Sequence, residues 1–432
     1  MSKIIINIIV HDGITSLYTG VGRIAYDIIR VLSKDVGLRS KYFVNGITCK
    51  YTKKCLGYDP KIKSETKLIL RGLNGKLYEC SNGSNGSVSY GNIDNWKMAS
   101  KSATELVQNI VKNNLNSTIV NLCLDTPFAH VPKFLSVYKF KNVRSVWIPH
   151  STVLIHKVDS AIKNSNNYLS QRLSWEKDAI DFASSVEKSW IGYIGVFMKK
   201  HLVDEYGVKT KSLVNFKNGL NISDSRFDKK LSQRQIRKVL QEYGIPTDKK
   251  LLFSFGRLEP YKGFEATIKI GGKFDGKVQT VLISQPYTKD DPNVEKYQKL
   301  MCKYNPKGIF LHNYKFNLPH ALMQWHNSHI LLVPSMAEPF GLIPEEARLY
   351  KNKMMRIICS NTGGFPEQIN NKTDGFLIDL KNLEFAYKEV FSISKLSETE
   401  ISKINEVGYN RAILDYDLKK NLQQSLSELI SA

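Results

Sequence analysis

The fold is decided by the stretch Pro334-Ser335-Met336-Ala337-Glu338-Pro339-Phe340-Gly341-Leu342-Ile343-Pro344-Glu345-Glu346-Ala347. Just before it, residues 330–333 form a short apolar run, which predicts a buried strand. Pro344 has no N–H and suits the first position of a helix. The predicted order is therefore strand, loop containing Gly341, then helix N-terminus.

A helix N-terminus presents free backbone N–H groups and a positive dipole end, so we expect an anion there, most simply a phosphate. Glu338 before the loop and Glu346 in the first helical turn can each accept hydrogen bonds from hydroxyl groups. A phosphate flanked by two hydroxyl-bearing rings describes a nucleotide sugar. The alternative is a surface loop and helix cap with solvated carboxylates, and a lone Glu pair at this spacing would favour it.

A second motif, Gly256-Arg257-Leu258-Glu259-Pro260-Tyr261-Lys262-Gly263, follows another predicted strand. Gly256 permits a tight exit from that strand. Arg257 offers a planar fork of donors and Lys262 a compact charge. A departing diphosphate needs positive charge nearby, and both cations suit that purpose. Two solvated cations at a strand end are the competing interpretation.

Together with Thr362-Gly363-Gly364-Phe365-Pro366-Glu367, these motifs resemble retaining GT-B glycosyltransferases, most closely glycosyltransferase family 4 (glycosyl transferases group 1). The resemblance implies a donor site in which Glu338 contacts the sugar and Glu346 the ribose. It assigns the diphosphate to Arg257 and Lys262. Backbone donors to phosphate are implied at Gly341, Leu342 and Ile343.

The resemblance covers most of the C-terminal half, and it rests on short matches in the N-terminal half. After Ala347 the chain departs from the family pattern of small residues, because Arg348 to Met355 intervene. This departure bears on where the local helix ends.

Strands alternate with helices twice along the chain, which predicts parallel sheets. The predicted fold is α/β of GT-B type, with two Rossmann-like domains facing each other across a cleft. We expect an N-terminal acceptor-binding domain over 1–220 and a C-terminal nucleotide-sugar-binding domain over 221–410. A single helix over about 405–432 is expected, whose part from 411 to 432 crosses back to the first domain. Residues 50–100, with their Ser/Asn/Gly-rich run, interrupt the alternation and suggest a mobile excursion.

Two features of the N-terminal half add candidate residues. Gly20 and Gly22 precede a predicted helix, where glycine lets the backbone approach an anionic ligand. This segment resembles the family's glycine loop, although glycine is common at any helix entry. His150 follows a predicted strand, and strand ends line the ligand crevice of α/β sheets. The resemblance implies that His150 lies near the reacting sugar and acceptor, while a structural role is an equal alternative.

Composition and the N-terminal segment indicate the class of protein and its expected cellular location. Apolar residues make up 42% of the chain and charged residues 24%, as in ordinary globular proteins. No run approaches the ~18 apolar residues of a membrane span. The N-terminal strand lacks a secretory cleavage site, so we expect a cytoplasmic protein, either free or peripheral on the inner face of the membrane. Asp415-Tyr416-Asp417 has the Asp-x-Asp form that metal-dependent glycosyltransferases of the other major fold use, but it falls in the predicted C-terminal helix and not at a strand end, so we assign it no metal. We also expect no cofactor, since the nucleotide sugar is the donor substrate.

The net charge of +22 implies attraction to anions. Basic and aromatic residues interleave between Lys133 and Arg144, a pattern that suits an anionic membrane surface. A solvated lysine-rich face is equally compatible with it. Nucleic acid ranks well below both, because the sequence contains no nucleic-acid-binding module.

The sequence therefore predicts an enzyme that moves a hexose or N-acetylhexosamine from a nucleotide diphosphate sugar to a glycan or lipid-linked acceptor. A UDP-sugar is the preferred donor, with GDP- and ADP-sugars as alternatives. We expect the enzyme to act in surface polysaccharide or lipopolysaccharide synthesis. We expect the transfer to retain the anomeric configuration of the sugar and to need no metal ion. The alternative is a non-catalytic GT-B scaffold that binds membrane or nucleic acid through its basic surface.

Overall fold

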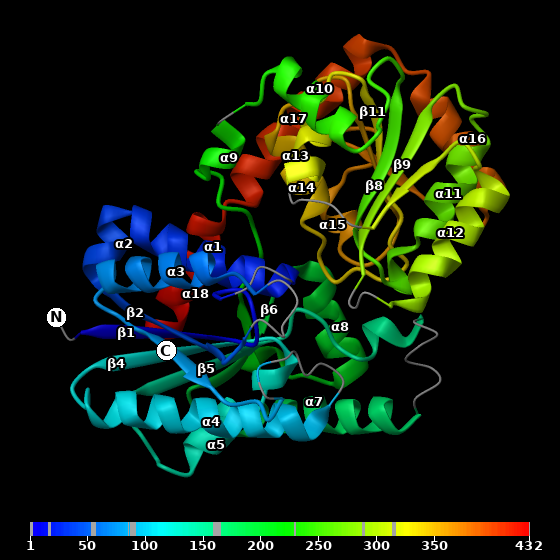
Figure 1. The fold of residues 1–432 in the computed structure, drawn as a ribbon. Helices are drawn as coiled ribbons and strands as arrows, with labels where there is room; N and C mark the ends of the chain where they lie inside the picture. Colours follow the sequence, from blue (N-terminus) through cyan, green and yellow to red (C-terminus); the bar gives the residue numbers. More distant parts are fainter. Residues whose placement is uncertain are drawn as a thin grey trace. The chain divides into compact units, whose positions relative to one another are not determined.

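The computed structural model describes residues 3–15, 19–52, 58–84, 86, 92–158, 166–228, 230–286, 290–312 and 317–431. The chain separates into two compact units (Figure 1). The first comprises Met1–Lys157, Ala161–Asn221 and Asp417–Ala432, and the second comprises Ile222–Tyr416 with Val158–Ser160. The sequence placed the corresponding breaks at 220/221 and 410/411.

A parallel sheet in the order β3-β2-β1-β4-β5-β6-β7 forms the centre of the first unit. Its strands are β1 (Ile4–Val10), β2 (Tyr42–Cys49), β3 (Leu77–Cys80), β4 (Thr118–Leu124), β5 (Val143–Ile148), β6 (Ser189–Tyr193) and β7 (Leu213–Asn215). Its helices are α1 (Gly20–Lys34), α2 (Val36–Lys41), α3 (Pro60–Gly72), α4 (Ile93–Lys112), α5 (Val131–Ser136), α7 (Asn166–Ser185), α8 (Val196–Tyr206) and α18 (Leu418–Ser431). In Figure 1, α1 and α3 lie on one face of this sheet and α4, α5 and α7 on the other.

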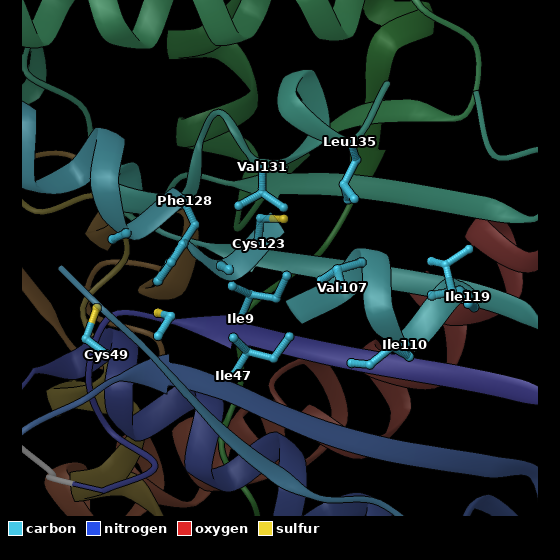
Figure 2. Packing of buried hydrophobic residues seen from close by; sticks show 14 of the residues in the cluster. Ile9, Ile47, Cys49, Val107, Ile110, Ile119, Cys123, Phe128, Val131 and Leu135 are labelled. Carbon is cyan, nitrogen blue, oxygen red and sulfur yellow. The ribbon is translucent and has the colours of Figure 1, made fainter. Parts of the chain in front are cut away.

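The first core lies between this sheet and α4 and α5. Figure 2 shows Ile9, Ile47 and Cys123 of three neighbouring strands packed with Val107 of α4 and Val131 of α5. The central strand β1 is nearly all aliphatic because helices cover both faces of the sheet.

One polar residue, Asn7, interrupts the apolar run of β1, and it is fully buried. Its Nδ2 donates to Asn121 Oδ1 at 2.8 Å, and its Oδ1 accepts from Asn45 Nδ2 at 2.9 Å. Asn121 Nδ2 then donates to Ser145 Oγ at 3.1 Å. This ladder satisfies the buried amides and ties four adjacent strands together.

The second unit has a parallel sheet in the order β10-β9-β8-β11-β12-β13. Its strands are β8 (Leu251–Arg257), β9 (Gln279–Gln285), β10 (Ile309–Leu311), β11 (Ser328–Val333), β12 (Arg356–Ser360) and β13 (Phe376–Ile378). Its helices are α9 (Ser225–Asp228), α10 (Gln233–Glu242), α11 (Phe264–Gly272), α12 (Pro292–Tyr304), α13 (Asn317–Gln324), α14 (Ile343–Leu349), α15 (Phe365–Gln368), α16 (Leu383–Ser394) and α17 (Glu398–Asp415). The two parallel sheets with interleaved helices confirm the predicted α/β class with two Rossmann-like domains.

Strand order reverses beside the first strand of each sheet, where β1 lies next to β4 and β8 next to β11. In open α/β sheets, ligands bind outside the carboxyl ends of the strands at this switch point. The loops that follow β8 and β11 are the two that the sequence singled out.

Three sequence predictions need correction. The described parts of residues 50–100 are not an excursion, since they supply α3, the edge strand β3 and the first part of α4. The expected single helix over 405–432 is two helices, α17 and α18, separated at Tyr416 and Asp417. Pro344 occupies the second position of α14, because that helix begins at Ile343.

Candidate functional site

The loop after β8 carries Arg257 and Lys262 and turns sharply at Gly263. Residues Pro260–Lys262 form one 3₁₀ turn, and Gly263 has φ +66° at the start of α11. A Cβ on Gly263 would lie 2.0 Å from the carbonyl oxygen of Pro334, so only glycine fits there. The N–H of Met336 donates to the carbonyl of Tyr261 at 2.7 Å. The two motif-bearing loops are therefore locked together.

Lys262 and Glu338 form the closest charged contact of the site. Lys262 Nζ lies 2.6 Å from Glu338 Oε2, and both side chains are mostly buried. Ser335 Oγ donates to the same carboxylate oxygen at 3.3 Å. Burial is the largest effect and opposes the charge on Lys262, but the charge of Glu338, its hydrogen bond and the neighbouring Tyr261 together hold the pKa of Lys262 above its usual value. Lys262 is thus a cation at neutral pH.

Arg257 lies on the same loop and is oriented by an aromatic neighbour. Its Nη2 donates to the hydroxyl of Tyr261 at 2.6 Å, and Tyr261 is itself buried. Burial raises the pKa of Tyr261, which therefore keeps its proton and accepts from the guanidinium. Two fixed cations thus share one loop.

The backbone of Glu338 is held by the turn at 362–364, for which the sequence had suggested no specific role. Gly363 has φ +56°, and a Cβ there would lie 2.0 Å from the carbonyl oxygen of Glu338. The N–H of Gly364 donates to that same oxygen at 2.9 Å. This third motif positions the first carboxylate.

Gly341, Leu342 and Ile343 connect Glu338 to α14 as predicted. Gly341 has φ +86°, and a Cβ there would lie 2.5 Å from Phe365 Cε1 and 3.0 Å from Glu338 Cγ. Leu342 is the N-cap residue and makes no side-chain cap. The turn therefore brings Gly341 next to the Glu338 side chain.

Glu346 lies in the first turn of α14 and is nearly buried. Its Oε1 is 3.8 Å from Arg226 Nη1, and Arg226 packs over the ring of Phe227 with 4.5 Å between the guanidinium carbon and the ring centroid. Arg226 comes from the short helix α9, in the segment that the sequence treated as a linker. No motif in the sequence indicates this contact.

A buried network of charged side chains connects α14 to α17. Arg348 is fully buried and donates to Glu345 Oε1, Asp374 Oδ1 and the carbonyl of Asp374, each at 2.8 Å. Arg411 of α17 donates to the second oxygen of Asp374 at 2.7 Å. From the sequence alone, Arg348 is recognised only as part of a segment that departs from the family pattern. In the structure it joins the helix of Glu346 to α17.

The remaining predicted residues belong to the first unit. Gly22 approaches Gly13 so closely that a Cβ on Gly22 would lie 2.5 Å from Gly13 Cα. Thr19 caps α1 by accepting from Gly22 N at 3.0 Å, and its hydroxyl donates to Asp12 at 2.7 Å. A Cβ on Gly20 would meet no atom of the described residues within 4 Å. Of these two glycines, Gly22 is therefore the one held against a neighbouring backbone.

His150 follows β5 and is 8% exposed. Its Nε2 is buried and makes no hydrogen bond within the described ranges. Burial lowers the pKa of His150 to about 3, so the ring is neutral at physiological pH. A neutral imidazole can donate or accept one hydrogen bond at Nε2, which suits the positioning of a hydroxyl group.

The loop after His150 is fixed by a polar network around Glu176. This buried carboxylate accepts from Val153 N at 3.1 Å, Arg172 Nε at 2.8 Å and the Tyr206 hydroxyl at 2.5 Å. Thr152 Oγ1 lies 2.7 Å from His201 Nε2. Sequence reasoning missed these residues, which join three separate segments.

In the part of the chain that the structure describes, no cluster of three or more His, Cys, Asp or Glu side chains is arranged to hold a metal ion. Likewise, the described helices include none that is both long and apolar enough to span a bilayer.

Comparison with known proteins bears on the second unit above all. Residues 235–404 match the family described as Glycosyl transferases group 1. Granule-bound starch synthase 1 of Solanum tuberosum is 32% identical over 159 residues, which are 36% of this chain and 25% of that protein. The chain thus covers about a quarter of the length of this relative.

Two solved structures resemble the whole chain. Sucrose-phosphate synthase from Thermosynechococcus elongatus matches with a TM-score of 0.73 at 13% identity and covers 99% of both chains. HepE of Anabaena in complex with UDP-glucose matches with a TM-score of 0.69 at 16% identity, covering 99% of this chain and all of that one. These two matches show that the chain shares the fold of those proteins, a two-unit α/β fold of GT-B type. Within the second unit, residues 235–404 are similar to the glycosyl transferases group 1 family.

Proposed function

We propose that the protein is a retaining glycosyltransferase of family 4 type, which transfers a sugar from a nucleotide diphosphate sugar. The observation that carries this proposal is the group of Arg257, Lys262 and Glu338 on interlocked loops after β8 and β11. Cations and a carboxylate at a switch point suit a diphosphate and an attached sugar. The group 1 match over 235–404 supports the same conclusion.

In this proposal Arg257 and Lys262 bind the diphosphate. Glu338 accepts hydrogen bonds from the donor sugar, and Glu346 accepts them from the ribose. The backbone N–H groups of Gly341, Leu342 and Ile343 donate to phosphate oxygens. Lys262 has three donors, so it can keep its contact with Glu338 while binding phosphate, and it would then link the leaving group to the sugar.

The transfer step breaks the bond between the anomeric carbon and the diphosphate oxygen, and the electron pair leaves with the diphosphate. The acceptor hydroxyl forms the new bond on the same face, and its proton passes to an oxygen of the departing diphosphate. The cations of the β8 loop stabilise the charge that develops there. His150 and the turn at Gly20 and Gly22 are proposed to position the donor or acceptor. We propose that the step requires neither a metal nor another cofactor.

The donor that we propose first is a UDP-sugar, with GDP- and ADP-sugars as alternatives. The UDP-glucose bound to HepE makes that compound the first to test. The proposed product is a hexosyl or N-acetylhexosaminyl unit on a glycan or lipid-linked acceptor. The role in surface polysaccharide or lipopolysaccharide synthesis and the cytoplasmic, membrane-peripheral position are part of this proposal.

One exposed surface favours the alternative function, a non-catalytic scaffold, and within it binding to membrane. Beyond α5, Val137 is 72% exposed and Tyr138 41% exposed, directly before the exposed Lys139 and close to the exposed Lys141. Apolar and cationic side chains together suit an anionic bilayer surface. A protein that bound such vesicles yet released no nucleotide from any donor would favour the scaffold.

The test combines a thermal-shift screen with an assay of nucleoside diphosphate release. A ligand that binds only the native state raises stability by RT ln(1 + [L]/Kd). We expect UDP, GDP or ADP to stabilise the wild type, and Lys262→Ala and Arg257→Ala to lose that shift. Lys269→Ala is the matched control, because Lys269 pairs with Glu265 on the neighbouring helix α11. Unchanged binding in both loop variants would contradict the assigned site.

A further inference from the structure

A cavity lies at the amino ends of the strands in the sheet of the second unit, whereas the candidate donor site follows their carboxyl ends. Its volume is about 390 Å³, within the range of pockets that hold small molecules. Its lining includes Lys250, Val278, Asn327 and Arg356, which stand at the amino ends of β8, β9, β11 and β12. Arg257 lies at the carboxyl end of β8, roughly 20 Å from Lys250 along the strand. The cavity is therefore separate from the donor site.

The lining of this cavity is strongly cationic. Among the described residues of the lining, Lys250, Lys277, Arg356 and Lys395 are positive and Glu398 alone is acidic. The three lysines are exposed at its margin, whereas Arg356 is 3% exposed. Clustered like charges repel one another, and the repulsion falls when an anion binds among them.

Arg356 is a buried cation that the protein satisfies only in part. Its Nη1 donates to the carbonyl of Met354 at 2.7 Å, and its Nη2 donates to the carbonyl of Leu396 at 2.5 Å. Its Nε is buried and has no hydrogen-bond partner within the described ranges. No carboxylate of the described residues lies within ion-pair distance of it. A buried charge of this kind favours an anionic ligand.

His329 fixes the orientation of that guanidinium. Its Nδ1 lies 3.1 Å from Arg356 Nη1 and must accept, since a guanidinium only donates. Its Nε2 lies 3.1 Å from the carbonyl of Ser394 and must donate. This arrangement requires a neutral ring. Burial, with Arg356, Lys250 and Lys395 nearby, lowers the pKa of His329 to about 4, so the positive field of the cavity reaches it.

We propose that this cavity binds a small phosphate-bearing anion, at a site distinct from the nucleotide site. Its floor is Arg356, held by His329 and two backbone carbonyls, and its margin is Lys250, Lys277 and Lys395. The volume admits a phosphate group with an attached sugar ring, so both inorganic phosphate and a hexose phosphate belong to the ligand class. A general attraction of anions by the +22 chain is the competing account.

The test is isothermal titration calorimetry of the full chain with inorganic phosphate and with glucose 6-phosphate, at fixed ionic strength. We expect saturable binding that persists in Lys262→Ala and in the presence of saturating UDP. Lys250→Ala/Lys395→Ala should weaken it about tenfold or more, as expected for lost charge-assisted contacts. Both lysines are exposed, so the fold should survive, which circular dichroism checks.

The matched control is Lys296→Ala/Lys299→Ala, which removes the same charge from α12, away from the cavity lining. We expect this variant to bind like the wild type. Tighter binding of the hexose phosphate than of phosphate would show that the ring is also held, and equal binding would show recognition of the phosphate alone. Absent binding, equal weakening in both double variants, or displacement by UDP would overturn the proposal.

Discussion

At the scale of single residues, short motifs select the candidate site residues but not the contacts between them. Arg257, Lys262, Glu338 and Glu346 each occur in a recognisable local pattern, and the loops after β8 and β11 bring three of them close together. The pairing of Glu346 with Arg226 could not be predicted, because it joins distant segments of the chain and α9 has no motif of its own. Residue patterns select candidate binding residues, and only the fold shows which of them pair.

Glu338→Ala should lower turnover much more than donor binding. The variant loses the acceptor that we assign to the donor sugar, while Lys262 stays available for the diphosphate. We expect kcat to fall about a hundredfold or more, as when one transition-state contact is removed, and donor Kd to change far less. Steady-state kinetics and donor titration measure the two effects, with Glu265→Ala as the control. Unchanged turnover would refute the role of Glu338.

Gly263→Ala should destabilise the protein by about 2–4 kcal/mol, from the left-handed backbone and the overlap with Pro334. Gly207→Ala is a matched control, because Gly207 has a similar φ of +69° and no atom of the described residues lies within 4 Å of its Cβ position. That variant should lose only about 1–2 kcal/mol. Urea denaturation gives both values, and equal losses would argue against the close approach of the two loops.

At the scale of elements, alternation of strands and helices predicts most of both sheets. It misses β2, β3 and β13. β13 has only three residues, and β3 has only four and adjoins a Ser/Asn/Gly-rich run. It also fails at the C-terminus, where the helical pattern continues across Tyr416. The break has a local cause, since Asp417 Oδ1 accepts from Lys419 N at 2.9 Å at the start of α18. Asp before an apolar helical run is a recognised start signal, so this boundary was accessible from sequence.

Arg348→Leu should strongly destabilise the contact between α14 and α17. It leaves Glu345 buried without its partner, and breaking a buried ion pair from one side typically costs about 3–5 kcal/mol. Burial already raises the pKa of Glu345, although Arg348 opposes that shift, so the pKa should rise further in the variant. Chemical denaturation measures the loss of stability.

The double variant Arg348→Leu/Glu345→Leu should recover part of that stability, because it removes the stranded carboxylate as well. Asp374 keeps its contact with Arg411 in both variants. A double variant that is less stable than the single one would show that Glu345 contributes independently of Arg348.

At the scale of the whole molecule, stability should fall in mild acid. Burial lowers the pKa values of His11 and His150 to about 3, and burial with nearby cations lowers that of His329 to about 4. The unfolded chain binds these protons below about pH 6.5, and the native protein does not. Stability is therefore complete above pH 6.5 and is lost as the pH falls, by about 2 kcal/mol per histidine at pH 5.

Urea unfolding at pH 8, 6.5 and 5 measures this loss, and His150→Asn should reduce it by about one histidine's share. His326→Gln is the control, since His326 is exposed. An unchanged pH slope in His150→Asn would show that His150 is not held neutral in the native state.

The chain leaves and re-enters the first unit at neighbouring points. Leu220 and Asp417 form a bridge, and Leu418 N donates to the carbonyl of Leu220 at 3.0 Å. Residues 222–416 are therefore an insertion in a discontinuous unit whose two cut ends lie next to each other. A short peptide joining 221 to 417 should close the first unit into a continuous chain that folds by itself, whereas deleting only α18 would expose the surface of α1 that packs against it.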